Sequence, residues 1–140
     1  MKTWQLRLVP GKFLAVQHGI SGNTMDLIKL SDAEIIEVAN PIMDNLMDAS
    51  TAIDHERHTR DFTDRAKSVL SKEWLQVICE DYQNTKGFFA KRQFVAIFRR
   101  PDSVAIVWKQ WFTKQEGEFV AEMVLVQKDG RYLVEHVMVL

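Results

Sequence analysis

The sequence has a single cysteine, Cys79, among its 140 residues. No disulfide can therefore form within the chain, and we expect a reducing compartment, with the cytoplasm as the default. The chain also lacks an apolar run of 18 residues, the length that a membrane-spanning helix needs. Near the start, Gln5, Arg7 and Lys12 interrupt the apolar segment that a signal peptide requires. These absences predict a protein with no membrane partner and no export signal.

An excess of charge of either sign is missing too. The chain carries 18 Lys and Arg against 19 Asp and Glu, for a formal net charge of -1, and its only basic cluster is Arg99-Arg100. Binding to phosphate backbones needs a basic face, so we predict no nucleic-acid partner. The hydrophobic fraction of 46% and the charged fraction of 26% are ordinary for a globular protein of one domain.

Motifs for cofactors and covalent catalysis are also absent. The sequence contains no glycine-rich phosphate loop, no nucleophile elbow and no paired-cysteine metal motif, so no cofactor is predicted. Cys79 precedes Glu80 and Asp81, whose negative charges raise a thiol pKa and argue against a nucleophile. Whether the chain is an enzyme stays open.

The densest polar stretch is residues 54–61. Within it His55 and His58 are three residues apart and, with Asp61, could share a helical face that binds a divalent metal. Charges that alternate along a helix are more typical of a solvated, ion-paired surface. We therefore predict no metal site.

Helical signals begin at Ser31. Ser31 and Glu34 form a capping box, and apolar residues follow at helical spacing. Pro41 falls inside this pattern and predicts a kink near Glu37 or a break. Apolar spacing predicts a second helical segment from Phe62 to Leu70. A third, capped by Ser71, ends before Gly87.

The first 30 residues differ from the rest. Trp4, Leu6 and Leu8 alternate with polar residues, and Pro10-Gly11 marks a turn. This pattern indicates a short hairpin or an arm, which we predict to dock as a strand. We accordingly divide the chain into an arm, residues 1–30, and a single α+β domain, residues 31–140.

From Phe88 onward the period changes from helical to alternating. Asp129-Gly130 lies between two apolar runs and is a strong hairpin signal. The pattern predicts an antiparallel meander, with the helices on one side, of four strands: 88–99, 103–113, 118–127 and 131–140.

Loop lengths suggest a register for these strands. They place Val95 opposite Trp108, Lys109 opposite Glu122, and Met123 opposite His136. In this register, the polar side chains on the face that the helices cover are uncharged at neutral pH. We predict that a pocket between this face and the helices is lined by Trp108, Gln110, Met123 and His136 from the sheet and by Tyr82 from the last helix. His136 is either a core histidine hydrogen-bonded to Gln110 or Tyr82, or a general acid–base catalyst.

The opposite face of the sheet is too apolar for a wetted surface. In the same register it carries Phe94, Phe98, Trp111, Val120 and Val139. Large exposed apolar patches mark association sites, so we predict a homodimer through this outer face. The alternative is that the arm covers it.

The capped helix at Ser31, the helical pair from Phe62 to Gly87, the four strands and the hairpin at Asp129-Gly130 together resemble the nuclear transport factor 2-like superfamily. The resemblance covers residues 31–140. It implies a cone in which a pocket lies between a curved sheet and the helices. Members include isomerases, dehydratases and non-catalytic modules for binding or dimerisation.

The steroid-isomerase-like members of that superfamily use a carboxylate base, with a tyrosine and a protonated carboxyl group in the oxyanion hole. The first predicted helix here has no tyrosine, and no aspartate falls on the predicted inner face. No catalytic residue is carried over. The sequence favours a non-catalytic domain that binds a small apolar molecule or forms a dimer. The alternatives are an isomerase- or dehydratase-like enzyme that uses His136, and a structural subunit.

Overall fold

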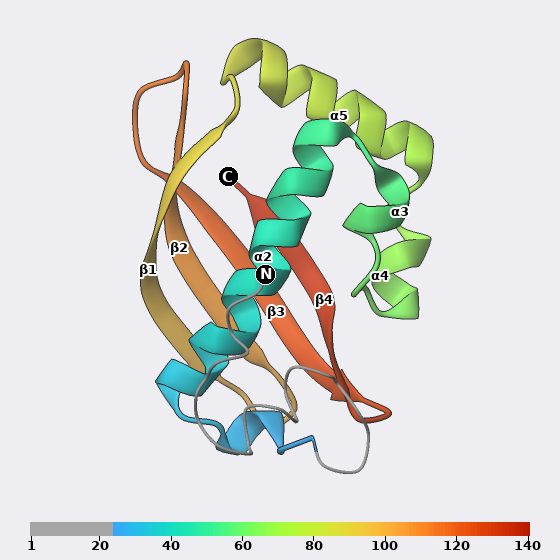
Figure 1. Cartoon of the computed structure of the whole chain (residues 1–140), viewed down its shortest axis with the longest axis vertical. Coiled ribbons are helices and arrows are strands. Elements are labelled where there is room, and N and C mark those ends of the chain that lie inside the picture. The colour runs from blue at the N-terminus through green and yellow to red at the C-terminus, as the bar shows by residue number, and fades with distance from the viewer. Residues whose placement is uncertain (1–23) are drawn as a thin grey trace.

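The structure is a computed structural model that describes residues 24–140 (Figure 1). Of the arm predicted for residues 1–30, residues 1–23 lie outside the described part of the chain. Helices come first along the chain, and four strands follow. The helices are η2 (Leu27–Lys29), α2 (Asp32–Ala52), α3 (His55–His58), α4 (Asp64–Ser68) and α5 (Lys72–Thr85). The strands are β1 (Phe89–Arg99), β2 (Val104–Phe112), β3 (Phe119–Lys128) and β4 (Arg131–Val139).

The strands form one antiparallel sheet in the order β1-β2-β3-β4, which confirms the predicted meander and the α+β class. The helices lie on one face of this sheet, and α2 crosses it (Figure 1). The Asp129-Gly130 turn joins β3 to β4, and both of its residues have positive φ, as a tight hairpin turn requires.

Helix α2 begins at the predicted capping box. The Ser31 hydroxyl accepts from the Glu34 backbone, and the Glu34 carboxylate accepts from the Ser31 backbone. The helix then runs without a break through Pro41, so of the two predicted alternatives the break is wrong, and the kink near Glu37 stays a prediction. Glu37 and Pro41 are exposed, so water can solvate the Glu37 carbonyl that proline leaves without a donor. The buried residues Val38 and Ala39 hold this turn on the sheet.

The core lies between α2 and the inner face of the sheet. Ile35 and Ala39 of α2 and Ile106 and Met123 of the sheet are completely buried. Leu27 of η2 belongs to the same cluster. The segment just before residue 31 is therefore part of the packed core.

A β-bulge at Glu135 changes the register of β4. Leu125 pairs with Val134, but Val124 pairs with His136, so Glu135 is an extra residue. A bulge of one residue turns every later side chain to the other face. His136 therefore lies opposite Val124 on the outer row, and the prediction that it faces Met123 is wrong. Val139 turns to the row of Ala121 on the helix side, so its predicted place on the outer face is also wrong.

A second bulge, at Val95, has the same effect on β1. Phe94 pairs with Trp108 and Ala96 with Val107, which places Phe94 on the helix-facing row instead of the outer face. The pairing of β2 with β3 differs from the prediction by two residues, because Lys109 lies opposite Val120 and not opposite Glu122. A shift of two keeps each side chain on its face. Phe98, Trp111 and Val120 accordingly remain on the outer face.

Candidate functional site

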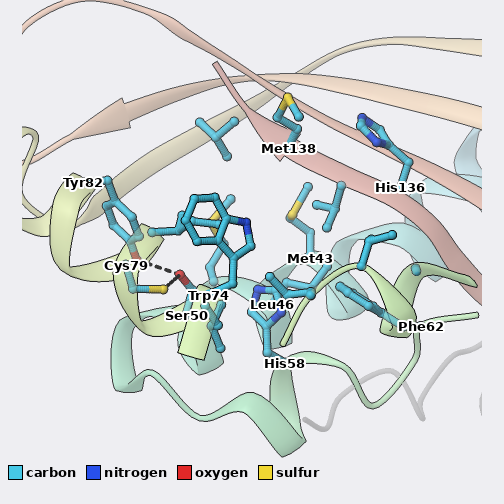
Figure 2. Close-up of a pocket in the computed structure, with 18 of the residues that line it drawn as sticks. Met43, Leu46, Ser50, His58, Phe62, Trp74, Cys79, Tyr82, His136 and Met138 are labelled. Carbon is cyan, nitrogen blue, oxygen red and sulfur yellow. Dashed lines mark hydrogen bonds between the residues drawn. The ribbon is translucent and has the colours of Figure 1, made fainter. Parts of the chain in front are cut away.

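An open cavity of about 600 Å³ lies between the helices and β4 (Figure 2). Its wall is mainly apolar, with side chains from α2, α4, α5 and the connections between them. These include Met43, Leu46, Met47, Phe62, Ala66, Leu75 and Ile78. The second part of β4, beyond the bulge, forms the opposite wall.

The cavity exists because α5 packs on α2 and stands off from β4. Leu75 and Cys79 are the buried residues of α5. Trp74 and Ile78, which sequence periodicity places on the same helical face, are more than a third exposed and line the cavity, as Val69 and Met138 do. An apolar mouth of this kind suits a ligand with a large apolar body.

One polar group in the wall is a hydrogen-bonded set between α2 and α5. The Ser50 hydroxyl lies 2.7 Å from the Tyr82 hydroxyl and 3.3 Å from the Cys79 sulfur. Burial raises the pKa of the Cys79 thiol and of the Tyr82 phenol, so both stay protonated at neutral pH. The pKa of Cys79 shifts in the predicted direction, but burial raises it, and not the charges of Glu80 and Asp81. A protonated thiol in this setting is a poor nucleophile.

The second polar group is His58. Its ring packs edge-on against Phe62, with 5.5 Å between the ring centroids. Its Nδ1 atom is buried without a hydrogen-bond partner. Burial, with a smaller contribution from the charge of His55, lowers the pKa of His58 to about 4. A neutral imidazole therefore lines the cavity at pH 7.

The residues considered for a metal do not converge. His55 Nε2 lies 2.7 Å from the Leu70 carbonyl, whereas His58 belongs to the cavity wall. The Asp61 carboxylate accepts from Arg131 at 3.2 Å. Among residues 24–140, no group of three His, Cys, Asp or Glu side chains is placed to hold a metal ion.

Charged groups occupy the rim of the cavity. Arg65 of α4 donates to the Glu135 carboxylate and to the Glu135 backbone carbonyl. The hydrogen bond from Arg65 lowers the pKa of Glu135. This ion pair ties α4 to the β4 bulge. Lys86 lines the cavity near the end of α5.

Two of the five predicted pocket residues, Tyr82 and His136, line this cavity. The other three, Trp108, Gln110 and Met123, are buried in the sheet core and are not part of its wall. Although His136 reaches the wall, its Nε2 lies 2.8 Å from the Glu122 carboxylate of the outer row.

Trp108 and Gln110 have structural partners. Trp108 Nε1 donates to Asn40 Oδ1 at 3.2 Å. Gln110 Nε2 donates to the Ala90 and Lys91 carbonyls of β1, where the strand has another register shift, and it does not meet His136. These two side chains support the sheet instead of contacting a ligand.

Sequence reasoning missed His58, Phe62 and Ser50 as cavity residues. A signal was present, because His58 and Phe62 are four residues apart and lead into the apolar positions of the next helix. Their placement in a charged stretch favoured a solvated helix. The helix α3 ends at His58, and the ring of this residue lines the cavity.

The part of the chain that the structure describes contains no helix long and apolar enough to cross a membrane.

No protein-family model and no curated protein matches the sequence. The chain is similar in structure to several solved proteins. A designed protein of the nuclear transport factor 2-like type has a TM-score of 0.55 at 12% identity, over 76% of this chain and 98% of the design. A putative calcium/calmodulin-dependent protein kinase type II association domain from Thiobacillus denitrificans has a TM-score of 0.52 at 10% identity, over 72% and 92%.

A SEC-C motif containing protein from Rhodopseudomonas palustris has a TM-score of 0.53 at 8% identity, over 71% of this chain and 77% of that one. At these identities the likeness shows the fold alone. The chain has the nuclear transport factor 2-like cone fold, as the arrangement of its helices and strands predicts.

Proposed function

We propose that this protein binds a small, mainly apolar molecule in the cavity between α2, α4, α5 and β4, without transforming it. The observation that carries the proposal is the apolar wall around about 600 Å³ of open space. Ligand pockets of small molecules have this size and this predominance of apolar side chains, with few polar groups to orient the ligand.

The state of the polar groups supports binding over catalysis. Ser50, Cys79 and Tyr82 are hydrogen-bonded to one another, and burial keeps the thiol and the phenol protonated. The histidine first considered as a catalyst, His136, contacts Glu122 on the outer row. A general base must reach a substrate proton, and no charged base lies in the middle of this wall.

The experiment compares two valine variants. Val69 lines the cavity and is 64% exposed, whereas Val77 lies on α5 away from the wall and is 54% exposed. Val69→Trp should narrow the mouth and weaken binding of an uncharged apolar fluorescent probe, N-phenyl-1-naphthylamine, about tenfold, because the added ring occupies ligand space. Val77→Trp is the control and should bind like the parent. Equal binding by both variants would contradict the proposal.

A second proposed role is self-association through the outer face of the sheet. Phe98 and Val120 are exposed there, and Trp111 is partly exposed. Exposed apolar patches of this kind mark association surfaces. The similar structure from Thiobacillus denitrificans is described as an association domain, which supports this role.

Sedimentation at micromolar concentration should give the mass of two chains, and Trp111→Glu should give one chain, because a buried unpaired carboxylate opposes association. The substitution Gln115→Glu, on the exposed turn after β2, changes the net charge by the same amount and is the control. A parent protein that stays monomeric would contradict the role, and removal of residues 1–24 would then test whether the arm covers the face.

A further inference from the structure

His58 is a polar side chain of the cavity wall that makes no hydrogen bond to any residue of the described part of the chain. The ring lies beside Leu46 at the wall (Figure 2), and its edge packs against Phe62. Its Nδ1 atom is enclosed and unpaired, and within residues 24–140 no hydrogen bond reaches Nε2 either. Ser50 and Tyr82, by contrast, satisfy each other at 2.7 Å. An imidazole left without partners beside an open cavity is available to a ligand.

The position of the ring proton follows from the burial of Nδ1. A neutral imidazole has one N–H donor and one acceptor nitrogen. Buried N–H groups without an acceptor are rarer in proteins than buried acceptors without a donor, so the enclosed Nδ1 is favoured as the bare acceptor. Nε2 then carries the proton. The ring nitrogen that is not enclosed is thus a hydrogen-bond donor without formal charge.

A neutral hydrogen-bond donor in an apolar wall favours an apolar ligand that has an uncharged acceptor. A carbonyl or ether oxygen can accept from Nε2–H while the rest of the molecule packs on Phe62 and the other apolar side chains. A carboxylate is disfavoured here, because it must lose its hydration without a cation to pair with in the middle of the wall. Of the two cations near the ends of the cavity, Arg65 is already engaged with Glu135, and Lys86 lies over the Phe119 ring at the end of α5.

We infer that His58 is the recognition residue of the cavity and that it donates a hydrogen bond from Nε2 to the carbonyl or ether oxygen of an uncharged, otherwise apolar ligand. This inference rests on the proposed function and names the class of ligand that the cavity takes.

The first test uses two probes of nearly equal shape, 2-acetylnaphthalene and 2-ethylnaphthalene, which differ in one oxygen. The ratio of their two dissociation constants is the readout, because the hydrocarbon is the more hydrophobic of the pair. His58→Phe keeps an aromatic ring and removes the donor. It should shift the ratio about fivefold in favour of 2-ethylnaphthalene, which corresponds to one hydrogen bond. His55→Gln, which alters the histidine outside the wall, should leave the ratio unchanged.

The outcomes separate the two proposals. If neither probe binds the parent protein, the proposed function fails together with the inference. If both probes bind but His58→Phe leaves their ratio unchanged, or His55→Gln shifts it equally, the inference fails and the apolar cavity stands. Tighter binding of 2-naphthoate than of 2-acetylnaphthalene would overturn the assignment to uncharged ligands.

A second measurement needs no variant. Long-range proton–nitrogen NMR spectra of the parent protein at pH 7 should show the His58 ring protonated at Nε2 and bare at Nδ1. Addition of 2-acetylnaphthalene should shift the Nε2 resonance more than Nδ1. A proton found on Nδ1 would overturn the inference even if His58→Phe failed to fold.

Discussion

The two halves of the protein interior contain similar residues but pack differently. In the closed half, Ile35 and Ala39 of α2 meet Ile106 and Leu125 of the sheet, and all four are completely buried. In the open half, residues such as Trp74 and those around it line a cavity of about 600 Å³. Both halves lie under the same long helix, so composition alone does not decide which half closes.

The positions of the covering helices explain the difference. In the closed half, α2 packs directly on the sheet, and η2 covers the end with Leu27. In the open half, α5 is anchored to α2 by the Ser50–Tyr82 hydrogen bond. The aromatic contact of Tyr82 with Phe89, with 5.0 Å between ring centroids, fixes the far end of α5 beside β1. Both contacts belong to Tyr82, near the C-terminal end of α5, so they leave space between the earlier turns of the helix and β4.

The largest expected difference between the halves is in the cost of removing a methionine side chain. Met123 of β3 is completely buried in the closed half, and Met138 of β4 is 44% exposed at the cavity mouth. Met123→Ala should reduce the free energy of unfolding by about 2–5 kcal/mol, because it leaves a cavity in a packed core. Met138→Ala should cost less than about 1 kcal/mol.

Urea unfolding of the two variants measures this difference. Similar losses in both would mean that the two halves are packed alike, which would break the comparison. A change in the denaturant slope as well as in the midpoint would show that the compactness of a state has changed, and the free energies would then not be comparable.

The next effect concerns the titration of His58 in the open half. Its pKa is lowered from 6.5 to about 4 in the folded protein, mainly by burial. Between these two values the unfolded chain binds more protons, so stability rises with pH through this window and is lost as pH falls. From pH 7 to pH 5 the loss should be about 2 kcal/mol. His58→Phe should remove this part of the pH dependence.

The measurement is urea unfolding of the parent and of His58→Phe at pH 7, 6 and 5. The other histidines are present in both proteins, so the difference between the two curves isolates His58. If the free energies of unfolding of the two proteins changed with pH in parallel, the ring would not be buried in the folded protein. The open half would then be more hydrated than its apolar wall indicates.

Sequence reasoning found the elements of both halves and the α+β fold. The capping box at Ser31 and the Asp129-Gly130 turn are local signals, because they depend on residues close together in the chain. The four strand boundaries accordingly came within two residues of those observed. The helix α2 passed through Pro41, since tertiary packing outweighed a local preference.

The same reasoning failed wherever a bulge intervened. Val95 and Glu135 are ordinary strand residues, and nothing in an alternating pattern marks an extra residue. Between each hairpin turn and its bulge, the side chains lie on the predicted face of the sheet. Just beyond the bulge they lie on the opposite face, which is why the predicted position of His136 is wrong. The cavity also depends on how far α5 stands from β4. That distance is set by contacts between elements distant in sequence, so the candidate site was only partly predictable.

The smallest effect concerns the ion pair at the rim of the open half. The side chains of Arg65 and Arg60 are equally exposed, at 58%, and each lies near a carboxylate. Arg65 connects α4 to Glu135 in the β4 bulge, whereas the ion pair of Arg60 is with its sequence neighbour Asp61, at 3.6 Å. Exposed ion pairs contribute about 0–1 kcal/mol, and pairs that connect separate elements through several hydrogen bonds lie at the upper end.

Arg65→Met should therefore cost about 0.5–1 kcal/mol at low salt, and Arg60→Met less than about 0.5 kcal/mol. Salt screens exposed charges, so the difference between the variants should shrink at 1 M sodium chloride. Hydrogen exchange adds a local readout, because a loosened α4 should exchange its Ala66 and Lys67 amides faster while the amides of Ile106 and Met123 stay protected. Equal protection of Ala66 in both variants would show that apolar packing alone holds α4 beside the cavity.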